Sequence, residues 1–186
     1  MLPHLSPARH IVTFDFLGWG ASDKPSDYSY TAANQLGELD AVIKQLALRK
    51  VILVAHDASG PPAIDWAFSQ PEQVAGLVLL NTYYYNMPTI RRPEAIYLFS
   101  TPFIRSIARP VSQMFGNLIF RKMFWWQVGR FFRAPKARDE FLPLFYRQFE
   151  MTPSTRPAFF GLNEDLLATV RSGTKKMQRL REFGRP

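Results

Sequence analysis

The chain has 186 residues, no cysteine and a formal net charge of +8 at pH 7. This length is enough for one domain with a sizeable core, and the lack of cysteine excludes a disulfide framework and a thiolate metal site. The sequence has no H-E-x-x-H pair of zinc ligands and no basic start followed by a long apolar stretch, as a signal peptide would have. We therefore expect no metal, no cofactor and a cytoplasmic location.

Charge and apolar residues are distributed unevenly. Residues 1–86 contain five basic and eight acidic side chains, whereas residues 87–186 contain eighteen and seven. A basic half is compatible with nucleic acid, with an anionic membrane surface, or with compensating acid elsewhere in a longer protein. No nucleic-acid-binding motif accompanies it, so we expect no nucleic acid partner. The most apolar region, 114–132, is interrupted by three basic residues and is too broken to predict a membrane span.

The first predicted element is a strand over residues 10–16, HIVTFDF. A G-x-G turn at 18–20 follows it, and Asp15 is expected to accept hydrogen bonds from local backbone N–H groups rather than to contact substrate. Thr31 is a good cap for a helix over 32–48, whose apolar residues recur at helical spacing and give it one apolar face.

The most informative segment is VILVAHDASG, residues 51–60. Its apolar, β-branched start, Val51 to Val54, is typical of a strand buried on both faces. Two prolines, Pro61 and Pro62, come next, and proline is tolerated in the first turn of a helix. The segment therefore predicts a strand, a tight turn with Asp57 at its apex, and a helix. This is the geometry of a nucleophile elbow.

Asp57 fits the nucleophile position better than Ser59 does. An elbow requires small residues two before and two after its nucleophile, because the backbone folds tightly against itself there. Around Asp57 these are Ala55 and Ser59, whereas around Ser59 they are Asp57 and Pro61. Two alternatives remain: Asp57 only caps the following helix, as Asp commonly does, or Ser59 is the nucleophile of an ordinary esterase.

A carboxylate nucleophile has definite chemistry. It can displace a leaving group from carbon or open a strained ring, and it forms a covalent ester. Backbone N–H groups at the helix start, that of Ala58 among them, would stabilise developing negative charge as an oxyanion hole. They would also help to keep Asp57 ionised. Hydrolysis of the ester then needs a general base, normally His, to activate water.

A third predicted strand covers residues 75–80, so strands and helices alternate with short links. This pattern predicts an α/β fold with parallel strands and crossover helices. After residue 86 the strand-like runs disappear, eight prolines occur up to position 157, and thirteen of the sixteen Phe are found. We expect short helices that form a cap over the elbow, with a cleft for a small apolar substrate. Tyr83 and Tyr84, at the junction of strand and cap, are candidate substrate contacts.

Three segments resemble the α/β-hydrolase superfamily, and specifically its Asp-nucleophile branch of haloalkane dehalogenases and epoxide hydrolases. The elbow AHDASGPPAIDWA is similar to the family's GHDWGG-type elbow. HIVTFDFLGWGASDKP (10–25) is similar to the strand and D-x-x-G-x-G-x-S-D-K-P loop before it, and PEQVAGLVLLNT (71–82) to the strand after it. The residue after the nucleophile is Ala58, where this branch commonly has Trp and fluoroacetate-type dehalogenases have Arg. The resemblance to epoxide hydrolases implies cap tyrosines that polarise a ring oxygen, for which Tyr97 and Tyr146 are candidates.

The resemblance also indicates parts of the fold that this sequence lacks. The family has an HG-x-P loop before the segment at residue 10 and, after the cap, strands that carry an Asp and the catalytic His. The histidines here, His4, His10 and His56, are more simply solvated or structural, so we expect no general base among these residues. On this basis we expect a partial α/β-hydrolase core with the elbow (1–86), a helical cap (87–178) and a lead-in to a missing core strand (179–186).

The leading hypothesis is therefore an α/β-fold hydrolase that forms a covalent ester on Asp57 with a small apolar substrate. One alternative is a truncated, non-catalytic fragment or binding subunit that pairs with a complementing chain. Another is an esterase that depends on Ser59. The sequence makes no prediction of the oligomeric state.

Overall fold

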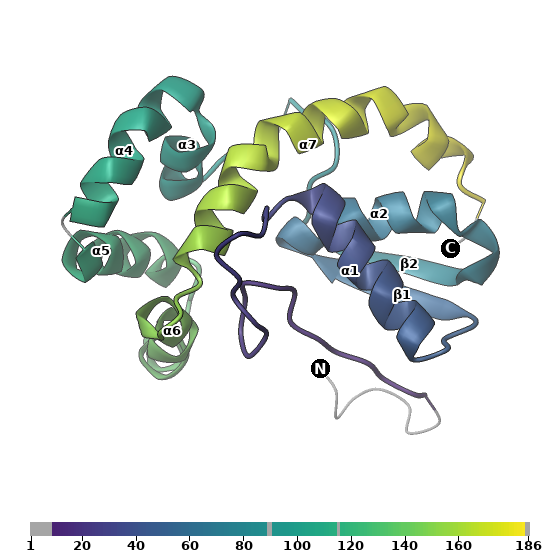
Figure 1. Cartoon of the computed structure of the whole chain (residues 1–186), viewed down its shortest axis with the longest axis horizontal. Helices are drawn as coiled ribbons and strands as arrows, with labels where there is room; N and C mark the ends of the chain where they lie inside the picture. Colours follow the sequence, from purple (N-terminus) through teal and green to yellow (C-terminus); the bar gives the residue numbers. More distant parts are fainter. Residues whose placement is uncertain (1–8, 89–90, 115, 185–186) are drawn as a thin grey trace.

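The computed structural model describes residues 9–88, 91–114 and 116–184, without the side chains of 113, 116 and 117, so His4 lies outside the described residues. A small sheet with two helices forms one part, four helices gather beside it, and a long last helix spans both parts (Figure 1). The elements in chain order are α1 (Ala32–Gln45), β1 (Val51–His56), α2 (Gly60–Ser69), β2 (Val74–Leu80), α3 (Glu94–Ser100), α4 (Pro102–Met114), α5 (Gly116–Gly129), α6 (Pro135–Glu150) and α7 (Arg156–Glu182), with short 3-10 turns at Asp57–Ser59 and Pro71–Gln73.

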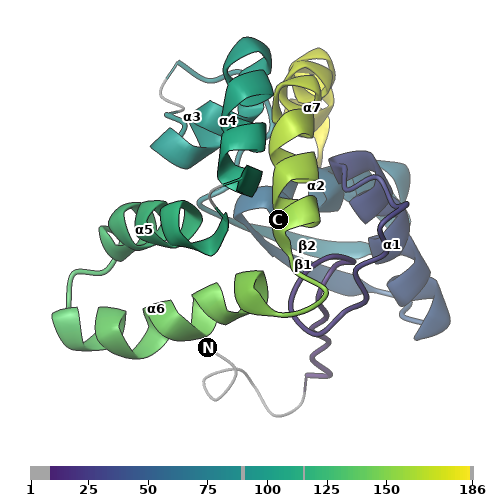
Figure 2. The same cartoon turned by 60° about the vertical axis from the view of Figure 1, so that its left-hand side comes forward.

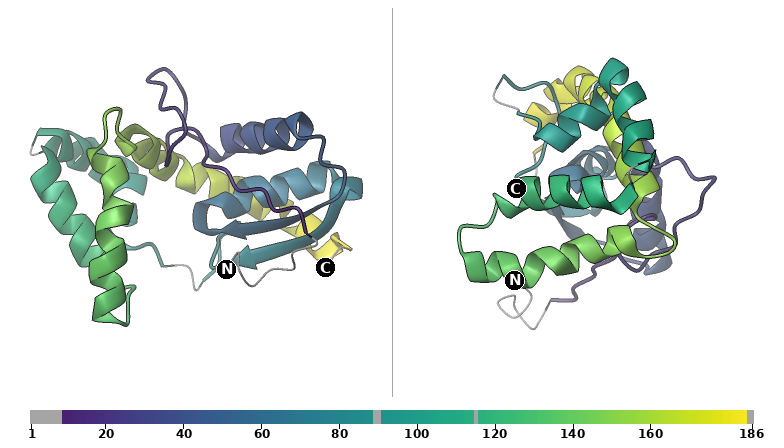
Figure 3. Two further views of the ribbon diagram at one scale, coloured as in Figure 1. Left: turned by 90° about the horizontal axis from the view of Figure 1, so that it is seen from below. Right: turned by 90° about the vertical axis from the view of Figure 1, so that its left-hand side faces the viewer.

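The sheet confirms the predicted α/β fold with parallel strands. β1 and β2 are parallel, with Val54 opposite Val78 and His56 opposite Leu80. Both α1 and α2 lie on one side of the two strands (Figure 3, left). The core between them consists of small and large apolar side chains from all four elements: Leu39, Ile43, Ala55, Ala63, Trp66, Ala67 and Val74. On the other face, Ile52, Val54 and Val78 are exposed, so only one face of this sheet is covered by the described residues.

The predicted strand over residues 10–16 is wrong. The sheet of the described chain has two strands, and residues 10–16 run as irregular backbone. A strand requires a neighbour that completes its ladder of hydrogen bonds, and these residues make no backbone bond to β1 or β2. The segment is held instead at its end, where the backbone N–H of Leu17 donates to Glu38 Oε2 of α1 at 2.7 Å.

Local polar contacts follow the sequence prediction. Thr31 caps α1 by accepting a hydrogen bond from the Asn34 backbone N–H at 3.2 Å. Asp15 accepts one from the Ala21 backbone N–H at 2.9 Å across the G-x-G turn. Both side chains therefore stabilise backbone, as expected.

Helix α1 ends at Gln45, three residues before the predicted end, because Ala47 adopts a left-handed conformation with φ of 50°.

The helical part has an aromatic core. Phe99, Phe120, Tyr146, Phe149 and Phe160 are buried together, and partly buried rings surround them. Ring centroids are 5.2 Å apart for Phe120 and Phe149 and 4.9 Å for Phe99 and Phe160, within the range of favourable aromatic pairs. Six of the thirteen Phe after residue 86 thus belong to this core between α3, α5, α6 and α7 (Figure 2).

The expected short helices are in part wrong. Pro110 lies inside α4 and Pro143 inside α6, and α7 is 27 residues long. Three other prolines occupy first turns, those of α4, α6 and α7, where the missing N–H has no helical partner in any case. Most of these prolines therefore begin or interrupt helices without ending them. Because α7 continues to Glu182, residues 179–182 of the expected lead-in segment belong to this helix.

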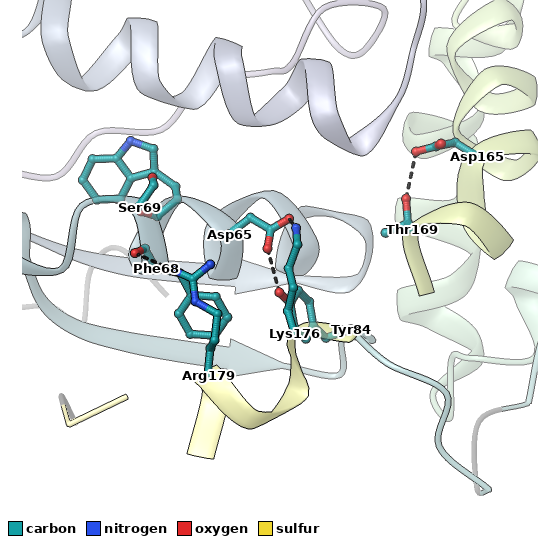
Figure 4. A network of polar contacts seen from close by, with 9 residues as sticks. Asp65, Phe68, Ser69, Tyr84, Asp165, Thr169, Lys176 and Arg179 are labelled. Atoms are coloured by element: carbon teal, nitrogen blue, oxygen red, sulfur yellow. Dashed lines mark hydrogen bonds and ion pairs between the residues drawn. The ribbon is translucent and has the colours of Figure 1, made fainter. Parts of the chain in front are cut away.

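The long helix α7 is attached to α2 by a polar network (Figure 4). Asp65 of α2 accepts a hydrogen bond from the Tyr84 hydroxyl at 2.6 Å and pairs with Lys176 Nζ of α7 at 2.7 Å. Arg179 of α7 donates to the Phe68 carbonyl at 3.2 Å and lies over the Phe68 ring. This network holds the helical part against the sheet part.

Candidate functional site

Asp57 occupies the apex that the sequence predicted. It follows β1 directly, begins the 3-10 turn before α2, and has a φ of 50°. A left-handed conformation in a residue other than glycine costs on the order of 1–2 kcal/mol, and such strain is found preferentially at functional sites. Asn81, the residue after the neighbouring strand β2, is also left-handed, with φ of 47°. Both strands therefore end in a sharp reversal at the same edge of the sheet.

Thr82 fixes the elbow from the end of β2. Its hydroxyl donates a short hydrogen bond of 2.5 Å to the Asp57 backbone carbonyl. A Cβ atom placed on Gly60 would overlap Thr82 Oγ1 and would lie 2.7 Å from Thr82 Cβ. Glycine at position 60 is thus required by the close approach of Thr82, which in turn holds the backbone of Asp57.

The Ser59 hydroxyl is engaged within the turn. It donates to the His56 carbonyl at 2.8 Å and accepts from the His56 backbone N–H at 2.9 Å. In contrast, the Asp57 carboxylate makes no hydrogen bond or ion pair with any other described residue, and Asp57 is solvent-exposed. The arrangement leaves Asp57 rather than Ser59 available to a substrate. Ala58 lies in the middle of the turn directly before α2, where backbone N–H groups point out of the helix start.

The electrostatic environment of Asp57 differs from the expectation. Although Asp57 is exposed, surrounding protein crowds its carboxyl group, and this partial desolvation is the largest cause of a raised pKa; the neighbouring His56 acts in the opposite direction. We expected the start of α2 to favour the ionised form, but desolvation outweighs any such effect. Exposure decides whether a reagent can reach the carboxylate, and desolvation makes that carboxylate a stronger nucleophile.

Tyr83 follows Thr82 directly in the segment after β2. Burial raises the pKa of its hydroxyl above the usual 10.0, and the charges of Asp57 and Asp165 raise it further. The Tyr83 hydroxyl therefore remains protonated. Asp165 was not among the predicted residues. It belongs to α7 and accepts a hydrogen bond from the Ala32 backbone N–H at 2.9 Å, a contact between residues 133 positions apart that no local pattern could reveal.

The other three tyrosines are placed elsewhere. Tyr84 is buried, and its hydroxyl is bound to Asp65 in the network that attaches α7 (Figure 4). Tyr146 is buried in the aromatic core, with a centroid 5.0 Å from Trp125. Tyr97 is exposed on α3 beneath Arg92. None of the three is hydrogen-bonded to Asp57 in the described structure.

Of the three histidines, two are described. His10 is exposed on the irregular N-terminal segment, and His56 is exposed beside the nucleophile position. Neither side chain is hydrogen-bonded to Asp57. The described part of the chain contains no group of three or more potential metal-ligating side chains. A hollow of about 650 Å³ lies on α5, away from the elbow, and is lined by Leu118, Arg121, Lys122, Trp125 and Trp126.

Known proteins resemble this chain in sequence. The family model for the α/β hydrolase fold matches residues 1–159. A cis-3-alkyl-4-alkyloxetan-2-one decarboxylase from Shewanella oneidensis is 34% identical over 98 residues, which are 50% of this chain and 31% of that protein. A haloalkane dehalogenase from Mesorhizobium japonicum is 34% identical over 80 residues, 43% of this chain and 26% of that protein.

Solved structures share the fold. The haloalkane dehalogenase DatA from Agrobacterium tumefaciens matches with a TM-score of 0.60 and 25% identity, over 89% of this chain and 55% of that chain. A putative ancestral haloalkane dehalogenase matches with a TM-score of 0.62 at 24% identity, over 89% and 58%. The chain thus spans a little over half of these solved relatives. No helix in the described residues is both long and apolar enough to cross a membrane.

Proposed function

This chain belongs to the α/β-hydrolase fold family, and we propose that it acts through a covalent ester on Asp57. The observation that carries the proposal is the elbow itself. The Asp57 carboxylate is exposed at a left-handed turn after β1, whereas the Ser59 hydroxyl is held by His56. A residue that served only as a helix cap would use its side chain on the backbone N–H groups of α2, and Asp57 makes no such bond.

The substrate we propose is a small apolar molecule with an electrophilic carbon. One carboxylate oxygen of Asp57 forms a bond to that carbon while the bond to the leaving group breaks, and the leaving group takes the electron pair. The relatives' names favour two such substrate classes. One is the alkyl halides, from the dehalogenases; the other is strained oxygen rings, because an oxetan-2-one is a four-membered ring.

Tyr83 and Ala58 take supporting roles in this proposal. When a strained ring ether such as an epoxide opens, the ring oxygen leaves as an alkoxide, which needs a proton or a hydrogen-bond donor; an oxetan-2-one opened at its alkyl carbon leaves a carboxylate instead. The protonated Tyr83 hydroxyl is suited to donate to the alkoxide oxygen, and the Ala58 backbone N–H stabilises negative charge when the ester carbonyl is attacked. Position 58 is Ala, where haloalkane dehalogenases commonly have Trp. Because that Trp, which helps to bind halide in the dehalogenases, is absent here, ring opening is favoured over halide displacement. We further propose that residues 87–178 act as the cap that keeps water from the ester.

The second step, hydrolysis, requires a base that activates water. Neither His10 nor His56 is hydrogen-bonded to Asp57 or oriented by a carboxylate partner in the described residues. We therefore expect the ester to accumulate on the isolated chain, which makes the first step directly observable.

The test is mass spectrometry of the chain after incubation with an alkyl epoxide and, separately, with an alkyl bromide. We expect one equivalent of adduct, located on Asp57, and none on the Asp57→Asn variant. Ser59→Ala is the matched control and should be labelled as the parent chain is. If a phosphonate labels Ser59 and neither electrophile labels Asp57, the esterase alternative is established.

A second candidate function, a binding subunit that pairs with a complementing chain, is favoured by the uncovered sheet face. Ile52, Val54 and Val78 are exposed together on adjacent strands, and monomeric proteins rarely expose such contiguous apolar surface. Reading frames next to the gene that encode an HG-x-P loop and strands with Asp and His would supply the complement. Co-expression with those frames should then yield a stable complex in which the ester on Asp57 turns over.

A further inference from the structure

A segment that runs from α3 into the first turn of α6 contains no acidic residue, and we call it the acid-free segment. From Ala95 to Arg138, 44 residues include eight Lys and Arg and no Asp or Glu. This segment supplies α4 and α5, which lie at the end of the molecule away from the sheet (Figures 1 and 2). Such a concentration of one charge sign attracts anionic partners and repels a second copy of itself.

One face of α4 is apolar and exposed. Phe103, Ile107, Val111 and Met114 recur at helical spacing and are all exposed, with 79% exposure for Phe103 and 73% for Met114. Residues separated by three and four positions share one side of a helix. These four side chains therefore form a continuous stripe, which we call the α4 stripe.

The opposite face of α4 is fastened to the rest of the protein. Arg109 forms an ion pair with Glu164 of α7 at 2.7 Å, and Arg105 donates to the Glu164 carbonyl at 3.3 Å. Because these two arginines lie across the helix from the α4 stripe, their contacts orient the stripe outward. The exposure of the stripe is thus a consequence of how α4 is anchored.

The neighbouring helix α5 combines aromatic and basic side chains. Leu118 and Trp126 are exposed, Arg130 lies 3.9 Å from the Trp126 ring centre, and Arg121 lies 4.9 Å from that of Trp125. Both arginines are also ion-paired, Arg130 with Glu94 and Arg121 with Glu150. Lys122 completes the open hollow on this helix and has no acidic partner within the described residues. Tryptophan with flanking Lys and Arg is typical of protein surfaces that sit at a membrane–water interface.

We propose that the α4 stripe and the basic, aromatic face of α5 dock onto an anionic lipid surface. In this arrangement the stripe inserts between lipid headgroups, Trp126 sits at headgroup level, and Lys122 contacts a lipid phosphate. Nucleic acid would satisfy the charges but would leave Ile107, Val111 and Met114 in water. A second copy would bury the apolar residues but would offer no acidic group to Lys122 from this face, because Glu94 and Glu150 are already paired with Arg130 and Arg121. The lipid surface satisfies both requirements.

The experiment is co-sedimentation of the chain with vesicles of pure phosphatidylcholine and of an equal mixture of phosphatidylcholine and phosphatidylglycerol. We expect binding to the anionic vesicles that weakens with added salt, and little binding to the neutral ones. Ile107→Ser with Met114→Ser should weaken binding about tenfold or more. Lys122→Gln should weaken it about fivefold, the equivalent of one basic residue near the surface.

The matched control is Ile52→Ser with Val54→Ser, which removes equally apolar exposed side chains from the uncovered sheet face and should leave vesicle binding unchanged. Circular dichroism of each variant verifies that its helices are retained. Equal binding to neutral vesicles, or an equal loss in the sheet-face control, would overturn the proposal. The proposal would also be overturned if the stripe variant still bound anionic vesicles and RNA competed with that binding, because basic residues alone would then account for the binding.

Discussion

The contact between Gly60 and Thr82 provides the sharpest test of the elbow geometry. In Gly60→Ala, the new Cβ would overlap Thr82 Oγ1 and lie 2.7 Å from Thr82 Cβ. Either the hydroxyl must leave its 2.5 Å hydrogen bond to the Asp57 carbonyl or α2 must shift away from β2. A lost hydrogen bond costs about 1 kcal/mol and overpacking about 1–3 kcal/mol, while alanine regains up to about 1 kcal/mol of helix propensity. The expected net loss of unfolding free energy is about 1–3 kcal/mol.

Urea unfolding monitored by circular dichroism measures this loss as a lower midpoint at an unchanged slope. The control is Gly37→Ala in α1, whose Cβ would meet no atom within 4 Å and which should be stabilising by up to about 1 kcal/mol. Combining Gly60→Ala with Thr82→Ala should recover part of the loss, because Oγ1 and Cγ2 are removed while Cβ remains. Strictly additive effects of the two substitutions would refute the reasoning, since they would mean that Gly60 and Thr82 do not compete for the same space.

Three further predictions concern other parts of the chain. Gly173→Ala places a Cβ onto the Tyr84 backbone carbonyl, which cannot rotate away as a side chain can, so α7 should be displaced. Thermal unfolding should show a loss of unfolding free energy of about 2–3 kcal/mol, in contrast to the gain expected for Gly37→Ala. Phe120→Ala empties a site that is 2% exposed in the aromatic core and should cost about 3–5 kcal/mol in the same measurement. Because the pKa of Asp57 is raised above the model-compound value of 3.8 in the folded state, the folded protein holds this proton more tightly, and stability is lost as pH rises from about 3.8 through the folded pKa. The unfolding free energy of the parent, relative to that of Asp57→Asn, should therefore fall as pH rises through that window. A relative increase would contradict the raised pKa. The rate of ester formation should increase over the same pH range.

The elbow could be predicted from sequence because its determinants are local. The apolar run of β1, the small residues around Asp57 and the two prolines of α2 all fall within a dozen positions, and each restricts the backbone directly. The parallel pairing of β1 and β2 followed from the short strand–helix–strand link for the same reason.

The errors concern contacts between distant residues. Residues 10–16 have the composition of a strand, but composition does not supply the neighbouring strand whose backbone completes a ladder. The hydroxyl of Tyr84 is bound to Asp65 of α2, which also pairs with Lys176 of α7. The prolines after residue 86 predicted short helices, whereas α7 is 27 residues long.

Three consecutive residues after β2 lie between Asp57 and the helical part. Thr82 holds the backbone of Asp57, the Tyr83 hydroxyl lies within the influence of the Asp57 charge, and Tyr84 is bound to Asp65 and packs against α7. The left-handed Asn81 reverses the chain just before them. We therefore expect a shift of α7 against Tyr84 to displace Thr82, which is two residues away and holds the backbone of Asp57. The position of the Asp57 carboxylate thus depends on the helical part as directly as on β1, and a substitution at Gly173, distant from Asp57 in sequence, should slow ester formation as well as lower stability.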